Sequence, residues 1–184
     1  MSDLIDKKNS EKNKKIIIAG LDNSGKSSIV LSIIGKMNLI NYLSLNPTIG
    51  PNITDFESID SKFNIWDLGG QKSYINEYIE NFESYITGCS KILFVIDVQD
   101  VQRYDLALKY LENIMKKIQQ MNLEIDTSIF LHKYDPDLKE IQPLITEEMI
   151  HDLIQKVKKL IPVSFFFEIY KTTIYTIFDK TLIY

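Results

Sequence analysis

Residues 20–27 carry the residue types and the spacing of a loop that binds phosphate. They read GLDNSGKS and fit the pattern G-x-x-x-x-G-K-[ST] at every fixed position. An apolar run at residues 16–19 precedes this phosphate loop and a helical pattern follows it, so that backbone N–H groups and the positive helix end face one anion. The alternative is a glycine-rich turn with a solvated lysine. The nucleotide-binding residues expected here are Asp22, Asn23, Ser24, Gly25, Lys26, Ser27 and Ser28.

Two of these side chains have chemical roles beyond phosphate binding. Lys26 can reach the β- and γ-phosphates of a nucleotide and neutralise their charge, so we count it as catalytic as well as binding. The Ser27 hydroxyl can bind Mg²⁺.

A second candidate lies in the loop at residues 46–50, which reads NPTIG. Thr48 can offer its hydroxyl to Mg²⁺ and its backbone N–H to a γ-phosphate. The second contact exists only with a nucleoside triphosphate, so such a loop can order and disorder with hydrolysis. Alone the signal is weak, because Pro-Thr is a common loop dipeptide.

A third motif, WDLGGQ at residues 66–71, follows an expected strand. Asp67 at the strand end would hold Mg²⁺, directly or through water. Gly70 leaves room for its N–H to approach a γ-phosphate, and Gln71 would orient the attacking water. A capped strand end followed by a flexible turn is the alternative interpretation.

A fourth motif, HKYD at residues 132–135, indicates which base is bound. Asp135 can accept hydrogen bonds from guanine N1–H and from the exocyclic amine, a donor pair that adenine lacks. The aliphatic stem of Lys133 can cover the flat base. We therefore expect His132, Lys133 and Asp135 to bind the guanine of GTP or GDP.

Together these motifs resemble those of small GTPases of the Ras-like superfamily, from about residue 15 to the end of the chain. They are most similar to the Arf branch in the opening GLD of the phosphate loop, in PTIG, in WDLGGQ and in the spacing from Thr48 to Trp66. His132, where most such proteins have asparagine, and Ile169-Tyr170 are similar to the Rag branch. The resemblance places a fifth guanine-binding element near residues 167–169, although their sequence FEI does not match the usual small Ser-Ala turn.

Composition favours one domain. The chain has 184 residues, of which 45% are hydrophobic, and we expect a polar, disordered leader at residues 1–14 followed by a GTPase domain at residues 15–184. A net charge of −4 argues against a nucleic-acid partner. The single cysteine, Cys89, suits a reducing compartment, and no signal peptide or membrane-spanning run is present, so we expect a cytoplasmic protein.

Membrane attachment is expected to be weak at most. Residue 2 is Ser2, which cannot carry the N-terminal myristoyl group of Arf proteins. Residues 1–15 contain several lysines that could touch anionic lipid, but too few apolar residues for a strong amphipathic helix.

The expected fold class is α/β, with the P-loop GTPase (Ras-like) fold: a mostly parallel six-stranded sheet with helices on both faces. The strands are expected at residues 15–19, 55–59, 63–67, 91–97, 128–131 and 163–167. The helices are expected at residues 26–37, in part of 71–85, and at 101–121, 146–160 and 172–184. We expect Asp100 to cap the helix at 101–121 and Leu106 to belong to its apolar stripe with Tyr110, Ile114, Met115 and Ile118.

The resemblance implies a GTP-binding switch with a Mg²⁺ ion held by Ser27, Thr48 and Asp67 and a water positioned by Gln71. Arg103, the one arginine in the chain, is interpreted as a solvated helix residue, so hydrolysis should be slow without an activating protein. Effectors and exchange factors are the other expected protein partners. A GTP-binding scaffold that does not hydrolyse remains the alternative, and an ATP-dependent enzyme is disfavoured by Asp135 and Gln71.

Overall fold

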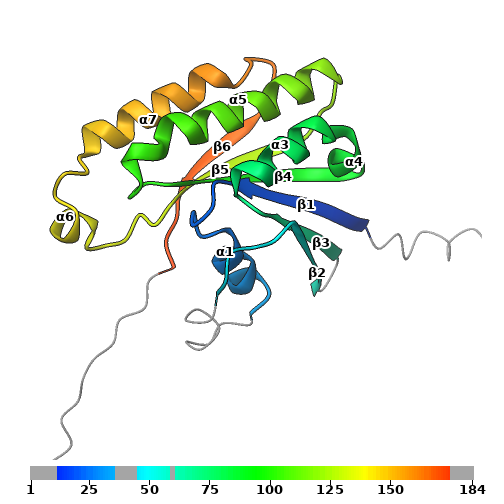
Figure 1. Ribbon diagram of the computed structural model, residues 1–184, viewed down its shortest axis with the longest axis horizontal. Helices are drawn as coiled ribbons and strands as arrows, with labels where there is room; N and C mark the ends of the chain where they lie inside the picture. The colour runs from blue at the N-terminus through cyan, green and yellow to red at the C-terminus, as the bar shows by residue number, and fades with distance from the viewer. Residues whose placement is uncertain (1–11, 36–44, 59–60, 175–184) are drawn as a thin grey trace, which may run out of the picture.

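The computed structural model describes residues 12–35, 45–58 and 61–174 (Figure 1). Within them, six strands form one sheet in the order β2-β3-β1-β4-β5-β6. Only β2 runs antiparallel to its neighbour. The strands are β1 (Lys12–Gly20), β2 (Pro51–Ser58), β3 (Ser61–Leu68), β4 (Cys89–Asp97), β5 (Asp126–His132) and β6 (Phe167–Lys171).

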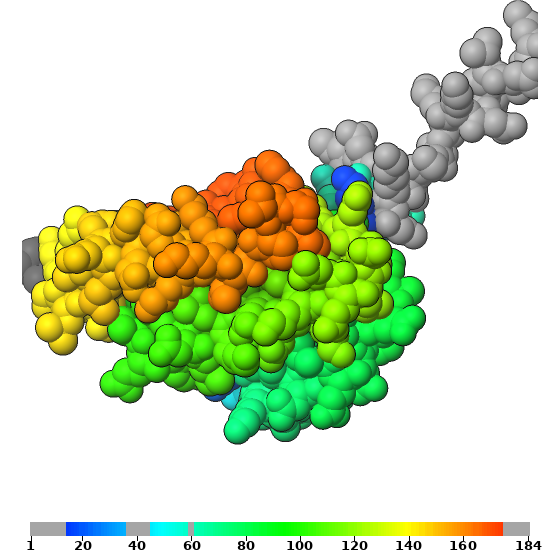
Figure 2. All heavy atoms as spheres, turned by 90° about the horizontal axis from the view of Figure 1, so that it is seen from above, coloured from blue at the N-terminus to red at the C-terminus, as the bar shows by residue number. Residues whose placement is uncertain are grey.

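Helices cover both faces of the sheet, with α1 on one face and α3, α4, α5 and α7 on the other (Figure 1). Seen from above, α7, α5 and the α3–α4 segment lie next to one another (Figure 2). None of the helices in the described ranges is long and apolar enough to span a membrane. The helices are α1 (Lys26–Ile33), α3 (Lys72–Glu80), α4 (Phe82–Ile86), the 3-10 turn η1 (Val101–Arg103), α5 (Tyr104–Gln120), α6 (Leu138–Ile141) and α7 (Glu147–Leu160).

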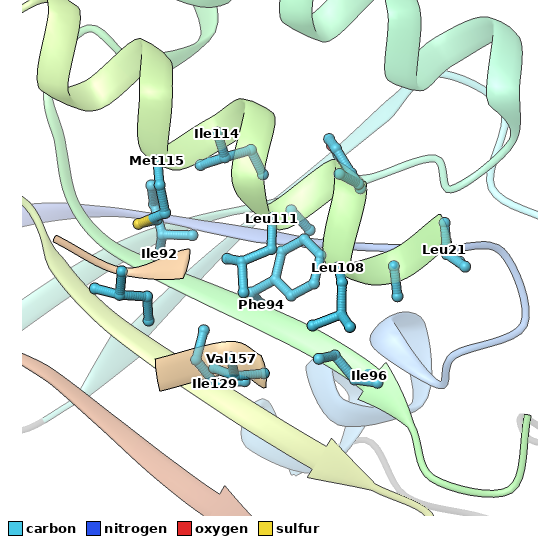
Figure 3. Packing of buried hydrophobic residues seen from close by; sticks show 14 of the residues in the cluster. Leu21, Ile92, Phe94, Ile96, Leu108, Leu111, Ile114, Met115, Ile129 and Val157 are labelled. Atoms are coloured by element: carbon cyan, nitrogen blue, oxygen red, sulfur yellow. The ribbon is translucent and has the colours of Figure 1, made fainter. Parts of the chain in front are cut away.

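The central strand β4 explains why both faces must be covered. Successive strand side chains point to opposite faces, and all of those at residues 92–97 are buried. Phe94 packs toward α5 in the larger core cluster, where Leu111 lies over it (Figure 3), whereas Leu93 and Val95 belong to the smaller cluster beneath α1. The expected fold class is therefore confirmed, and the parallel strands bring their carboxyl ends to one edge of the sheet.

The last strand differs from the expectation of residues 163–167. β6 is Phe167–Lys171, while Val163 is fully exposed. Residues 162–165 instead form a turn in which the Phe165 N–H donates to the Pro162 carbonyl. The strand begins where pairing with β5 begins, at Phe167 opposite Thr127. The apolar character of residues 163–167 did not show where this pairing begins.

The helix at residues 101–121 also differs in detail. It opens with a 3-10 turn at Val101–Arg103, and the Asp100 carboxylate binds the Arg103 guanidinium instead of capping backbone N–H groups. Leu106 is 50% exposed, so its assignment to the apolar stripe was wrong, whereas the other stripe residues are buried. The inward face is completed by Ala107, Leu108 and Leu111.

The remaining expected boundaries agree within a few residues or fall partly outside the described ranges. β1 begins at Lys12, three residues before the expected strand and inside the expected leader. Residues 172–174 are not helical, and the rest of the expected last helix lies outside the described residues. α1 ends at Ile33, four residues before the expected end, and residues 34–35 form a turn. Residues 36–37 of that expected helix and residues 1–11 of the expected leader lie outside the described residues.

Two leucines of α5 offer a matched test of this core. We expect Leu111→Ala to lower the free energy of unfolding by about 2–5 kcal/mol, because it leaves a cavity against Phe94. Leu106→Ala removes the same atoms from an exposed site and should cost about 0.5 kcal/mol or less. Urea unfolding of both variants measures the difference, and equal losses would contradict the packing described here.

Candidate nucleotide-binding site

The phosphate loop connects the carboxyl end of β1 to the start of α1. Gly25 lies at φ +90°, in the left-handed region, and precedes the first residue of α1. A Cβ at this position would lie 2.5 Å from Cδ2 of His132, so the loop and the guanine-binding motif are in direct contact through a glycine. No other residue could occupy position 25 without moving one of them.

Lys26 lies inside this loop and is 5% exposed. Its Nζ donates a hydrogen bond of 2.7 Å to the Leu21 carbonyl, across the loop. Burial lowers the pKa of Lys26 to about 8, although the carboxylates of Asp67 and Asp22 act in the opposite direction. A bound phosphate would supply the negative charge that this buried ammonium lacks.

Three oxygen-bearing side chains from different segments meet beside Lys26, and we call them the oxygen cluster: Ser27, Thr48 and Asp67. The Ser27 hydroxyl donates to Oδ2 of Asp67 and lies 3.0 Å from the Thr48 hydroxyl. Thr48 is also a donor to Oδ2 of Asp67, at 3.4 Å. These are the three residues predicted from the sequence as metal ligands.

The chemistry of the oxygen cluster suits a magnesium ion. Oδ1 of Asp67 is buried and has no hydrogen-bond partner among the described residues. Burial raises the pKa of Asp67, against the opposing effects of the Ser27 hydrogen bond and the Lys26 charge. Mg²⁺ prefers oxygen ligands, and it would occupy the unused oxygen and favour the ionised carboxylate. No group of three or more His, Cys, Asp or Glu side chains in the described ranges offers a different kind of metal site.

The third motif lies directly against the phosphate loop. The Asp22 N–H donates to the Gly70 carbonyl at 3.0 Å, and a Cβ on Gly70 would lie 2.1 Å from the Asp22 nitrogen. The neighbouring Gly69 N–H donates to the Gly50 carbonyl at 3.1 Å, which joins the Thr48 loop to the same turn. The Thr48 loop and the WDLGGQ motif are therefore connected to each other and to the phosphate loop.

A cavity of about 310 Å³ lies between these loops. Gln71 is exposed, immediately precedes α3 and lines this cavity together with Lys26 and Thr48. A larger hollow of about 1080 Å³ lies beside the amino ends of β5 and β6, and its lining includes Glu168 of the expected fifth guanine-binding segment but no residue of the other four motifs. The predicted residues that line the smaller cavity are Asp22, Asn23, Gly25, Lys26, Ser27, Ser28, Thr48, Gly70 and Gln71. Of the predicted phosphate-loop residues only Ser24 does not line it; it is buried at 2% exposure.

Two residues that the sequence analysis did not identify hold the Asp135 carboxylate. Thr173 donates from its hydroxyl to Oδ1, and Gln99 donates from Nε2 to Oδ2 at 2.9 Å and to the Lys133 carbonyl at 3.0 Å. Each carboxylate oxygen can accept two hydrogen bonds, so one acceptor position on each remains for a base. These contacts fix the plane of the carboxylate before any ligand arrives.

Lys133 adopts a positive φ of +60° and its ammonium lies 2.6 Å from Oδ2 of Asp97. This ion pair anchors the charged end of the side chain at the end of β4. The aliphatic stem is the part left to cover a base, as the sequence analysis expected.

His132 is buried, and it connects the guanine-binding motif to two other segments. Its Nδ1 lies 3.0 Å from the Thr172 hydroxyl, and its ring edge faces Gly25 of the phosphate loop. Burial is the main reason that the pKa of His132 is lowered, and the Lys133 charge adds to the effect. His132 thus contacts both the phosphate loop and the segment that follows β6.

Residues 167–169, where the resemblance places a fifth guanine-binding element, lie within β6 and pair with residues 127–129 of β5. Thr172 and Thr173 directly follow that strand and contact His132 and Asp135. The sequence analysis did not single out these two hydroxyl residues, because it placed the last strand too early.

Arg103 was also misjudged. It is not a solvated helix residue: its Nη1 lies 2.8 Å from Oδ1 of Asp22 and its Nη2 donates to the Asp22 carbonyl at 3.2 Å. Its Nε binds the Asp100 carboxylate. The one arginine of the chain therefore contacts the phosphate loop directly.

A mostly parallel sheet with this phosphate loop, the oxygen cluster and the Asp135 carboxylate at its carboxyl edge is the arrangement of the small GTPases. Residues 15–183 match the family model described as the Gtr1/RagA G protein conserved region, so the chain belongs to that family, within the Ras superfamily. It is a small GTP-binding protein of the Arf and Rag type, as the motifs predicted.

Individual relatives agree with this assignment. ADP-ribosylation factor-like protein 2 of Arabidopsis thaliana is 37% identical over 110 residues, which cover 60% of this chain and 55% of that protein. ADP-ribosylation factor F of Dictyostelium discoideum is 27% identical over 143 residues, or 78% of this chain and 69% of that protein.

The fold has a solved counterpart. The structure of the Arl6 BBS3 small GTPase from Trypanosoma brucei, with bound nucleotide analogue GppNp, matches with a TM-score of 0.68 and 21% identity, covering 88% of this chain and 87% of that one. The chain matches only about half the length of the first curated relatives, at 55% and 49%.

The buried His132 predicts a specific response to acid. A lowered pKa means that the native state binds fewer protons than the unfolded state below about pH 6.5, so stability falls as the pH drops through that range. We expect His132→Asn to lose less stability than the wild type between about pH 7.5 and about pH 5.5. Thermal unfolding across this range measures the effect. His151→Asn, at an exposed position on α7, is the matched control, and the account is wrong if both variants follow the wild-type curve.

Proposed function

We propose that this protein is a molecular switch that binds GTP and hydrolyses it slowly to GDP. It presents nucleotide-dependent loops to effectors. The observation that carries this proposal is the meeting of Ser27, Thr48 and Asp67 beside the buried Lys26. One of these oxygens belongs to the phosphate loop, one to the loop at residues 46–50 and one to the WDLGGQ motif. A single ligand at this point therefore contacts all three segments.

In the proposed mechanism, Ser27, Thr48 and Asp67 would hold Mg²⁺, and the ion would offset the negative charge of the nucleotide phosphates. Lys26 is already buried in the loop and would transfer its hydrogen bond from the Leu21 carbonyl to a phosphate oxygen. Gln71 lines the same cavity and is exposed to solvent, so it can hold a water molecule next to the γ-phosphate. Gly70 lies directly against the phosphate loop, so its N–H would be close to a γ-phosphate bound there.

The switching step would act through Thr48 and the turn at residues 69–71. Thr48 is only partly buried, and it is joined to the turn by the Gly69–Gly50 hydrogen bond. A γ-phosphate would add contacts to both segments, and its loss would remove those contacts together. Effectors, exchange factors and activating proteins are the expected partners, in trafficking or signalling by analogy with Arf and Rag proteins.

Guanine selection would come from Asp135, whose carboxylate plane is held by Thr173 and Gln99. The solved relative from Trypanosoma brucei contains a guanine nucleotide analogue, which supports the same ligand class here. Guanine nucleotide with Mg²⁺ is accordingly the proposed ligand.

One observation favours the alternative of a scaffold that binds GTP without hydrolysing it. The Arg103 guanidinium is held by Asp22 and Asp100. No other arginine exists in the chain to stabilise charge that develops on the transferred phosphate. Either hydrolysis depends on a partner that supplies such a group, or the protein remains in one state.

Single-turnover GTP hydrolysis with Mg²⁺ tests the proposal, after a competition assay has established that GDP binds more tightly than ADP. We expect slow turnover in the wild type and loss of that turnover in Gln71→Leu, because the amide that orients water is gone, with GDP binding unchanged. Lys72→Leu changes the adjacent exposed residue and should leave the rate unaltered. GTP that binds equally and remains intact in both proteins would indicate the scaffold, and equal affinity for ADP would overturn the guanine assignment.

A further inference from the structure

An acidic side chain lies in the loop that must hold phosphates. Asp22 lines the proposed phosphate cavity, and its carboxylate is half exposed. Like charges placed close together repel, and a bound nucleotide brings negative charge into this cavity. A carboxylate without a partner at this position would weaken nucleotide binding.

Arg103 compensates for that charge from outside the cavity. Its Nη1 pairs with Oδ1 of Asp22 at 2.8 Å, and its Nη2 donates to the Asp22 carbonyl at 3.2 Å. The backbone N–H of Asp22 donates to the Gly70 carbonyl at 3.0 Å. The position of Asp22 is therefore fixed from two sides, by the Arg103 guanidinium and by the backbone of Gly70.

The arginine is itself preorganised for this contact. Asp100 lies three residues earlier and binds Nε of Arg103, while the Arg103 N–H donates to the Asp100 carbonyl at 3.0 Å. This turn directs both Nη atoms toward the phosphate loop.

We propose that Arg103 is a positioning residue for nucleotide retention, which neutralises Asp22 and holds its backbone so that the phosphate loop can keep an anionic ligand. The inference rests on the proposed function, because it presumes that the cavity receives nucleotide phosphates. The pair is partly exposed, and exposed ion pairs stabilise folds little. Its effect is therefore expected in ligand release and not in unfolding.

A double-mutant cycle on the release of a fluorescent GDP analogue tests this inference. We expect Arg103→Gln to accelerate release about tenfold, because Asp22 then faces the phosphates unpaired. Asp22→Asn is the second single variant of the cycle and should release the analogue more slowly than Arg103→Gln, because it contains no unpaired carboxylate. The double variant Asp22→Asn, Arg103→Gln should be much slower than Arg103→Gln alone, because it contains no uncompensated charge.

Two further variants separate this role from a structural one. Arg103→Lys keeps the charge without the fork and should release the analogue at an intermediate rate. Lys109→Gln, which removes an exposed cation of α5 that pairs with Glu112, should match the wild type. The urea unfolding midpoint of Arg103→Gln should remain close to that of the wild type.

The outcomes also separate this inference from the proposed function. Two results would overturn the inference and leave the switch proposal standing. In the first, Arg103→Gln releases the analogue at the wild-type rate. In the second, the double variant releases it as fast as Arg103→Gln does. A wild-type protein that does not bind the GDP analogue at all would overturn both.

Discussion

The described structure depends on a buried carboxylate at the end of one strand. Asp67 is 1% exposed, and a charge in that position must be paired or bound to a cation. Ser27 and Thr48 supply hydrogen bonds to one of its oxygens, and the other oxygen has no protein partner in the described ranges. Parallel pairing of β1 with β3, which sets Ile18 opposite Asp67, brings this carboxylate next to the phosphate loop. The antiparallel pairing of β2 with β3 returns the chain so that the Thr48 loop arrives at the same point.

The base-binding end repeats this arrangement with different chemistry. β5 and β6 end side by side. The Tyr134 N–H donates to the Thr172 carbonyl, and the Thr172 N–H donates to the carbonyl of Leu131 near the end of β5. The Thr172 and Thr173 hydroxyls then reach His132 and Asp135. Because His132 also lies against Gly25, the base-binding and phosphate-binding halves form one connected site. The buried imidazole of His132 occupies the place at which most small GTPases have asparagine.

The parts that could be predicted from the sequence are those in which contiguous residues act together. The phosphate loop, WDLGGQ and HKYD each follow a strand, so the parallel sheet necessarily brings them to one edge. Arg103, Gln99 and Thr173 act across long separations in the chain, and nothing in their local sequence states which residue they face. The position of β6 was missed for a related reason, since strand pairing and not apolar content decides where a strand begins. Leu106 was misassigned because the apolar residues of α5 span a wide face of the helix, and the sequence does not show which of them point toward the sheet.

The central claim is that the oxygen cluster binds Mg²⁺ and thereby joins the nucleotide to the Thr48 loop. Dissociation of a nonhydrolysable GTP analogue, measured with excess Mg²⁺ and with a chelator, in the wild type and in Thr48→Ala, tests it most directly. The account predicts that Mg²⁺ slows release from the wild type severalfold and slows release from Thr48→Ala much less, because one metal ligand is missing. Release that is the same with and without Mg²⁺ in the wild type would contradict it.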